Sequence, residues 1–277
     1  MSTHFVKSHG LGNDYLVADP AELPVELSPA RVQLICDRHH GVGSDGILVL
    51  TEAQGGADHG LRIFNPDGSE AEKSGNGIRI FAKWLYDTRR ARVRAFAIAT
   101  LSGTVHVEVE VAGDRASSVT ANMGRPTFRD DLRSIEHGGQ SLPVVVLSIG
   151  NPHCVVVRDH LDVADLRWFG PLIERHPAFP NRTNVQLARP VARDRVEALI
   201  WERGAGETLA SGSSACAVAA ACHRLGLVDE QVTVAMPGGE LSVRVDPGGD
   251  LWMRGPVEEI ALITLSPDVI ARLRALA

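Results

Sequence analysis

The stretch FNPDGSEAEKSGNG, from Phe64 to Gly77, decides the fold, because it recurs as IWERGAGETLASGSS, from Ile200 to Ser214. At an offset of 137 residues, the pairs that align are Glu70 with Glu207, Ser74 with Ser211, and Gly75 with Gly212. Two looser matches fall in the same order: Gly12-Asn13 with Gly150-Asn151, and MGRP at Met123 with MRGP at Met253. Three ordered matches at about half the chain length indicate a duplicated unit.

Local patterns agree with two similar halves. Alternating, β-branched runs typical of strands occur in both halves, at VHVEVEV from Val105, VVVLSI from Val144, VEALIWE from Val196 and LSVRV from Leu241. After each Ser-Gly the pattern predicts a helix, from Gly75 to about Asp87 and from Gly212 to about Leu225. The second helix is apolar nearly all round, and such a helix is usually buried on every side.

These patterns predict an α/β fold of the α+β type. We expect two pseudo-symmetric domains, each a mixed, barrel-like sheet wrapped around a central helix. The expected domains are residues 1–118, joined by the C-terminal segment 262–277, and residues 119–261. The boundary is expected near Ser117 to Thr120, and a C-terminal helix is expected from Pro267.

Composition excludes several classes of protein. The 277 residues are 44% hydrophobic and 22% charged, which is enough core for one large domain or two. No run of about eighteen apolar residues and no secretory signal is present, so we expect a cytoplasmic protein with no membrane partner. The formal net charge of −6 does not attract a phosphate backbone, so we expect no nucleic-acid partner.

Few residues could hold a cofactor or a metal. The only lysines are Lys7, Lys73 and Lys83, in no phosphate-cradling context, which disfavours pyridoxal phosphate. GVGSDG, from Gly41, precedes the apolar run ILVL, whereas a dinucleotide fingerprint follows a strand and opens a helix. The histidines are not accompanied by a second cluster of residues at the spacing typical of metal ligands. We therefore expect no cofactor and no metal.

The two Ser-Gly openings are candidate anion sites. A helix N-terminus presents unsatisfied backbone N–H groups and a positive dipole end. A small carboxylate held between Gly75-Asn76 and Gly212-Ser213 would have Ser74 on one side and Ser211 on the other. Serine is also among the commonest N-cap residues, so either serine alone could be structural. Duplication favours the functional interpretation.

Six ordered motifs between Phe5 and about Pro256 resemble diaminopimelate epimerase. They are HGLGNDY (from His9), RHHGVGSDG (from Arg38), FNPDGSE (from Phe64), SGNGIR (from Ser74), GNPHC (from Gly150) and ERGAGET (from Glu202). The last motif separates the chain from the related proline racemase and phenazine-biosynthesis-like families. The resemblance implies a pseudo-symmetric two-domain fold, a possible homodimer, and cofactor-independent interconversion of LL- and meso-diaminopimelate for lysine and peptidoglycan synthesis.

The same resemblance implies the roles of individual residues. The substrate would be held by Asn13, Asn65, Asn151, Asn184, Glu202 and Arg203, with the last two near its distal ammonium and carboxylate. Backbone N–H groups of Gly75-Asn76 and Gly212-Ser213 would bind the reacting carboxylate. These choices are chemically sensible, because arginine binds a carboxylate bidentately while asparagine orients a ligand without adding charge.

One departure from the family pattern bears on activity. In the family two cysteines face the α-carbon from opposite sides, one removing a proton and the other supplying one, and here those positions hold Ser74 and Ser211. The actual cysteines lie elsewhere, at Cys36, Cys154, Cys216 and Cys222. We favour an epimerase scaffold with strongly impaired catalysis. The alternatives are a racemase, epimerase or dehydratase of another amino acid that uses serine, and a non-catalytic amino-acid-binding protein.

Overall fold

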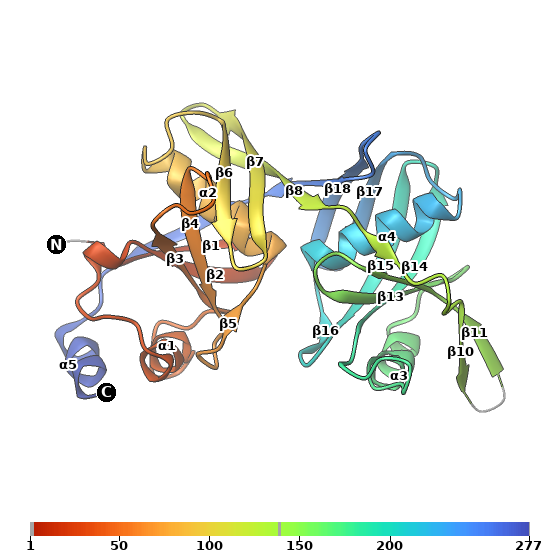
Figure 1. Cartoon of the computed structure of the whole chain (residues 1–277). Coiled ribbons are helices and arrows are strands. Elements are labelled where there is room, and N and C mark those ends of the chain that lie inside the picture. The colour runs from red at the N-terminus through yellow and green to blue at the C-terminus, as the bar shows by residue number, and fades with distance from the viewer. Residues whose placement is uncertain (1–2, 138–139, 277) are drawn as a thin grey trace. The chain divides into compact units, whose positions relative to one another are not determined.

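The computed structural model describes residues 3–137 and 140–276 and divides into two compact units (Figure 1). Unit 1 comprises Met1–Ala121 and Pro256–Ala277, and unit 2 comprises Asn122–Gly255. The expected boundaries, at 118/119 and 261/262, differ by a few residues because the chain crosses between units inside strands β8 (Arg115–Gly124) and β19 (Leu251–Pro256) and not in a linker. Residues 1, 2 and 277, which the expected first domain includes, lie outside the described residues.

Unit 1 is built on one mixed sheet. Its strand order is β20-β1-β2-β3-β4-β6-β7-β8, and short β5 also pairs with β4. The bounds are β1 (Phe5–Gly10), β2 (Asn13–Ala18), β3 (Ile47–Thr51), β4 (His59–Phe64), β5 (Glu70–Ala71), β6 (Ala95–Thr100), β7 (Gly103–Ala112) and β20 (Glu258–Ile263). Its helices are η1 (Pro20–Glu22), α1 (Pro29–Cys36), α2 (Gly75–Asp87) and α5 (Pro267–Ala275).

Unit 2 repeats this plan. Its strand order is β9-β12-β13-β14-β15-β17-β18-β19, and short β16 also pairs with β15. The bounds are β9 (Thr127–Phe128), β12 (Val145–Ser148), β13 (Pro152–Val157), β14 (Asn184–Ala192), β15 (Arg195–Glu202), β16 (Gly206–Thr208), β17 (Gln231–Met236) and β18 (Gly239–Val245). Strands β10 (Ser134–His137) and β11 (Gln140–Pro143) form a separate hairpin, and the helices are α3 (Val163–Glu174) and α4 (Gly212–Arg224).

The direction of each strand pairing is the same in both units. In unit 1, β2–β3 and β4–β6 are parallel and the other neighbouring pairs are antiparallel. In unit 2, β13–β14 and β15–β17 are the parallel pairs. Even the first turns agree, because Gly12 and Gly150 both have φ of 87°, a left-handed value that favours glycine. The predicted mixed α+β fold with two related halves is confirmed.

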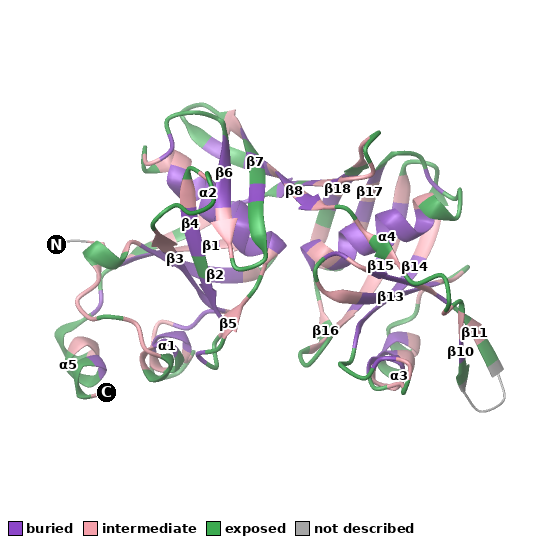
Figure 2. Ribbon diagram, viewed as in Figure 1, coloured by how far each residue is buried: buried purple, intermediate pink, exposed green. Residues whose placement is uncertain are grey.

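A buried helix lies at the centre of each unit (Figure 2). In α2 every residue from Gly75 to Leu85 is buried, and in α4 Gly212 and every residue from Ser214 to Cys222 are buried. Helix α4 packs on strands β12 to β15, β17 and β18. Its interior is mostly alanine, serine and cysteine, so the sheet can close around it without large side chains in between.

The outer helices complete two hydrophobic cores. In unit 1, α1 and α5 lie together over a cluster that includes Phe5, Leu16 and Ile47. Arg31 of α1 donates from Nε to the carbonyl of Leu273 in α5 at 2.9 Å. In unit 2, α3 covers β14, β15 and β16. Among residues 3–137 and 140–276, no helix has the length and apolarity needed to cross a membrane.

The last turn of α2, the central helix of unit 1, contains a buried ion pair. Lys83 Nζ lies 2.8 Å from Asp87 Oδ2, with side chains only 7% and 6% exposed, and also donates to the carbonyl of Ala116. Arg115 binds the same carboxylate but is 51% exposed. Lys83→Met should therefore reduce the opening free energy of α2 amides by about 3 kcal/mol, because it leaves a buried carboxylate without its nearest cation.

The matched control is Arg115→Met, which removes an exposed partner of the same carboxylate and should cost less than about 1 kcal/mol. Native-state hydrogen exchange of α2 measures both losses. Equal losses in the two variants would contradict the assignment of this stability to the buried pair.

Candidate active site

Ser74 is the N-cap residue of helix α2 in unit 1 and follows the short strand β5. The Ser74 side chain caps the helix, accepting a hydrogen bond from the Gly77 backbone N–H at 3.1 Å. Its Oγ also lies 3.2 Å from the Tyr15 hydroxyl. Ser74 thus performs the structural capping role that the sequence left open, and it does so at the predicted helix start.

A chain of side-chain amides runs beside this helix start. Asn13, at the start of β2, accepts from Asn76 Nδ2 at 3.1 Å. Asn76 accepts in turn from Arg79 NH2 at 2.9 Å, and Arg79 NH1 donates to the carbonyl of Gly75 at 3.2 Å. Arg79 is completely buried. The structure therefore brings together three of the predicted residues of unit 1, Asn13, Gly75 and Asn76.

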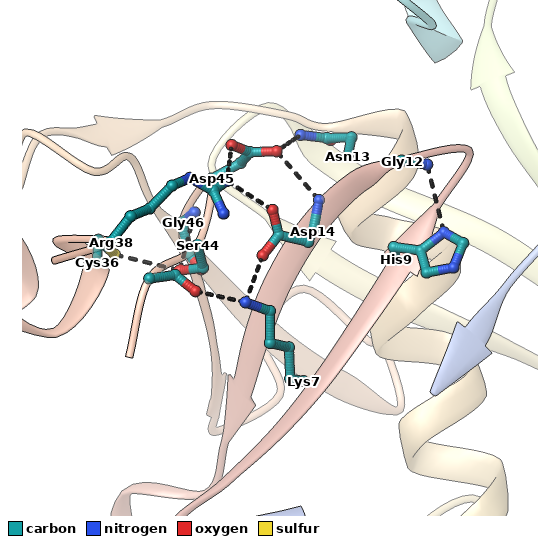
Figure 3. A network of polar contacts seen from close by, with 11 residues as sticks. Lys7, His9, Gly12, Asn13, Asp14, Cys36, Arg38, Ser44, Asp45 and Gly46 are labelled. Carbon is teal, nitrogen blue, oxygen red and sulfur yellow. Dashed lines mark hydrogen bonds and ion pairs between the residues drawn. The ribbon is translucent and has the colours of Figure 1, made fainter. Parts of the chain in front are cut away.

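Charged residues hold the other end of Asn13 (Figure 3). Asp45 Oδ2 accepts from Asn13 Nδ2 at 2.9 Å and from the Asp14 backbone N–H at 3.1 Å. Arg38 bridges Asp45 and Asp14, at 2.7 Å from each, and Lys7 lies 2.9 Å from Asp14. Burial would raise the pKa of Asp14, but the hydrogen bonds from Arg38 and Lys7 outweigh burial and hold that pKa below its usual value.

The amide orientation of Asn13 follows from these partners. An ionised carboxylate can only accept, so Asp45 selects the Nδ2 end of Asn13. The Oδ1 end then points to Asn76, whose own Oδ1 faces the guanidinium of Arg79, a group that can only donate. Two charged residues thus determine which way both asparagine amides point.

Ser211 occupies the N-cap position of helix α4 in unit 2 and is buried at 4% exposure. Its backbone has the same extended conformation as Ser74, but its side chain makes no capping bond to the helix. The two serines therefore share a position in the repeat and differ in what their hydroxyls do. Gly212 is buried beside Ser211, and Ser213 is half-buried.

A second polar chain runs beside α4. Gln186 Nε2 donates to His153 Nδ1 at 3.0 Å, so the ring hydrogen lies on Nε2, which faces Asn151 Oδ1 at 2.9 Å. Asn151 Nδ2 donates to Ser213 Oγ at 3.4 Å. His153 is completely buried, and this burial lowers its pKa to about 3, with a further contribution from the positive charge of Arg203. His153 is therefore a neutral group that orients Asn151.

Asn184 lies between the Asn151 region and Arg203. Its Oδ1 accepts from the Arg203 backbone N–H at 2.9 Å, and its Nδ2 donates to the carbonyl of Pro152 at 2.9 Å. Both ends of the amide are thus used by backbone. Arg203 is exposed and donates from NH1 to the carbonyl of Asn181 at 3.3 Å, and Glu202 immediately precedes it at the end of β15.

One predicted residue lies outside both polar chains. Asn65 follows β4 and donates from Nδ2 to Ser69 Oγ at 3.0 Å, within the turn of residues 65–69. This side-chain contact is local, in contrast to those of Asn13 and Asn151.

The thiols are poorly suited to proton transfer. All four cysteines are buried and reduced. Burial raises the pKa of Cys36 and Cys154, and it raises the pKa of Cys222 to about 12. A thiolate at these positions is therefore strongly disfavoured near neutral pH.

Sequence reasoning missed several residues that orient the site. Asp45 and Arg38 could have been identified from the sequence, since both belong to the RHHGVGSDG motif. Outside the family resemblance, that motif was tested only for the glycine spacing of a nucleotide-binding site. Gln186 and Arg79 lie in the buried parts of β14 and α2, where no local pattern identifies their partners and only the three-dimensional contacts do.

The buried His153 leads to a pH prediction. Its folded-state pKa of about 3 lies below the ordinary 6.5, so between these values the unfolded chain binds more protons. The stability that neutral His153 contributes is fully present above pH 6.5 and is lost as pH falls. From pH 7 to 5 this loss should be about 2 kcal/mol, and His153→Gln should remove it from urea-unfolding data.

His106→Gln serves as the control, because it removes an exposed imidazole from β7. The same pH dependence in the wild-type chain and in His153→Gln would be evidence against a buried neutral imidazole.

The chain resembles known proteins in both units. The family model of diaminopimelate epimerase matches residues 5–129 and 145–260. Diaminopimelate epimerase 2 of Nostoc sp. is 42% identical over 279 residues, covering 96% of this chain and 97% of the relative. The diaminopimelate epimerase of Pelotomaculum thermopropionicum is 40% identical over 271 residues, covering 93% and 96%.

Solved structures show the same fold at low sequence identity. A predicted epimerase from Pseudomonas aeruginosa has a TM-score of 0.72 at 19% identity, covering 96% of this chain and 100% of that one. A hydroxyproline epimerase from Agrobacterium vitis, with bound trans-4-hydroxy-L-proline, has a TM-score of 0.73 at 14% identity, covering 97% and 94%. With the family model matched in both halves and 42% identity along nearly the full length, this chain belongs to the diaminopimelate epimerase family, a family of isomerases.

Proposed function

We propose that this chain binds LL- and meso-diaminopimelate, with Ser74 and Ser211 at the two proton-transfer positions. The observation that carries the proposal is the repeat itself. Each unit begins its buried central helix with Ser-Gly and sets an oriented asparagine, Asn13 or Asn151, beside that helix start. In this family, two such helix starts suit a ligand with one reacting α-carbon.

In the proposed complex the ligand is held at both ends. The reacting carboxylate accepts from the backbone N–H groups of Gly75-Asn76 and Gly212-Ser213, where the helix dipoles favour a negative charge. Arg203 binds the distal carboxylate and Glu202 the distal ammonium. The remaining polar contacts come from Asn13, Asn65, Asn151 and Asn184.

The proposed chemistry is strongly impaired by the two hydroxyls. Epimerisation requires a base to remove the α-proton on one face and an acid to return a proton on the other. A thiol has an ordinary pKa of about 8.5, and if the serine pKa is about five units higher, forming the alkoxide adds about 7 kcal/mol, or about 10⁵-fold in rate. We infer that the chain binds its ligand and turns it over very slowly.

The proposal involves no pyridoxal phosphate. Support comes from two of the three lysines, since Lys7 is paired with Asp14 and Lys83 with Asp87, and neither is poised as a Schiff-base amine. A cytoplasmic location stays a prediction from the sequence, and a homodimeric state stays a prediction that rests on the family resemblance.

A second candidate is an amino-acid-binding protein without turnover. It is favoured by the Ser74 hydroxyl, which already accepts from Gly77 and contacts Tyr15 and so has a structural role to keep it in place. The same pocket residues would serve either candidate, and proton exchange separates them.

The first functional prediction restores the thiols. The double variant Ser74→Cys with Ser211→Cys should exchange the α-proton of diaminopimelate with deuterated water readily, because each thiol can ionise at a helix N-terminus. The unaltered chain should exchange it about 10⁵-fold more slowly. Proton NMR of the α-position measures both rates.

The two single variants are the controls, and each should stay far below the double variant because a two-base reaction needs both groups. If the double variant binds diaminopimelate yet exchanges no proton, the assignment of an epimerase scaffold fails. Rapid exchange by the unaltered chain would instead show that the hydroxyls themselves are competent.

The second functional prediction concerns the distal carboxylate. Arg203→Ala should weaken diaminopimelate binding roughly ten- to hundredfold, since it removes a charge-assisted hydrogen bond of about 1.5–3 kcal/mol. Calorimetry measures the affinity. Arg189→Ala is the control, because Arg189 lies on β14 and is paired with Glu197. An unchanged affinity in Arg203→Ala would place the ligand elsewhere.

A further inference from the structure

A buried carboxylate that is not among the proposed ligand contacts binds the backbone next to Arg203. Glu174 is the last residue of α3 and is only 3% exposed. Its Oε2 accepts from Trp201 Nε1 at 2.8 Å, and its Oε1 accepts from the Gly204 backbone N–H at 3.0 Å. Arg182 lies 3.6 Å from Oε1. Burial would raise the pKa of Glu174, but these donors and Arg175 outweigh burial, and the pKa lies below its usual value.

In the sequence, the two hydrogen-bond donors to Glu174 flank the two residues proposed to bind the distal end of the ligand. Trp201 precedes Glu202 and Gly204 follows Arg203. Since Asn184 accepts from the Arg203 backbone N–H, the turn is held at three residues, Trp201, Arg203 and Gly204. Gly204 has φ of 81°, so the turn reverses at a residue that favours this conformation.

The indole of Trp201 packs closely against helix α3. A Cβ added at Gly170, one turn before Glu174 on α3, would lie 2.5 Å from Cδ2 of Trp201. Helix α3 therefore approaches the flat face of the indole as closely as glycine permits. The carboxylate, the indole and the turn form one rigid assembly, which we call the Glu174 clamp: Gly170, Glu174, Trp201 and Gly204.

We propose that Glu174 is a positioning residue, which holds the turn of residues 202–204 so that Arg203 is presented to the distal carboxylate of an amino-acid ligand. This inference rests on the proposed function. Glu174 itself contacts no ligand in this account. It acts through the backbone of Gly204 and the ring of Trp201, and so determines selectivity for ligands that carry a second carboxylate.

The test compares two ligands that differ only at the distal end. L-Lysine has the chain and both amino groups of diaminopimelate but lacks its distal carboxylate. Glu174→Gln keeps the size of the side chain but replaces one acceptor oxygen by an NH₂ group, which cannot accept from Trp201 or Gly204. Calorimetry should show about tenfold weaker binding of diaminopimelate, with lysine affinity unchanged.

The matched control is Glu197→Gln on β15, where the carboxylate pairs with Arg189 away from the clamp. It should leave both affinities unchanged. Equal weakening of both ligands by Glu174→Gln would mean a general structural role and would overturn the proposal, as would unchanged binding of both.

A measurement without ligand keeps this inference separate from the proposed function. In Glu174→Gln the amides of Arg203 and Gly204 should exchange with deuterated water at least tenfold faster, whereas amides of α4 should keep their rates. Unchanged exchange in the turn overturns the clamp. If the unaltered chain binds no diaminopimelate, the proposed function fails, and the exchange rates alone decide whether Glu174 holds the turn.

Discussion

The structure depends on the first turn of two buried helices, whose backbone N–H groups have no partner within the helix. At the start of α2 one of these groups, that of Gly77, is satisfied by the Ser74 hydroxyl. At the start of α4 the Ser211 side chain makes no such bond. The other first-turn donors lie close to a positive dipole end, which favours an anion. In the proposed complex this anion is the reacting carboxylate of diaminopimelate.

Asparagines can orient a ligand only if their own amides are fixed, and each unit achieves this differently. In unit 1 the charges of Asp45 and Arg79 determine the direction of Asn13 and Asn76. In unit 2 a neutral, fully buried His153 does this for Asn151, with Gln186 fixing the imidazole tautomer. The repeat thus conserves the geometry of the helix start while the supporting groups differ in charge.

Most of the fold could be predicted from the sequence, because the repeated Ser-Gly stretch and the alternating strands carry local signals. Helix α2 runs from Gly75 to Asp87 as predicted, and α4 ends at Arg224, one residue before the predicted end. The first crossing between units was expected a few residues before its observed place and the second a few residues after it, since β8 and β19 each cross without a break. The supporting residues could not be predicted, because Glu174 and Gln186 act on partners 27 to 33 positions away, through contacts that no local pattern encodes.

The proposed function requires that the starts of α2 and α4 both respond to diaminopimelate. Amide NMR during titration with diaminopimelate tests it most directly, by following the backbone N–H signals of Asn76 and Ser213 in the same sample. The account predicts that both signals shift together, with a single affinity and one ligand per chain. Shifts in only one unit, or two affinities for the two signals, would contradict it.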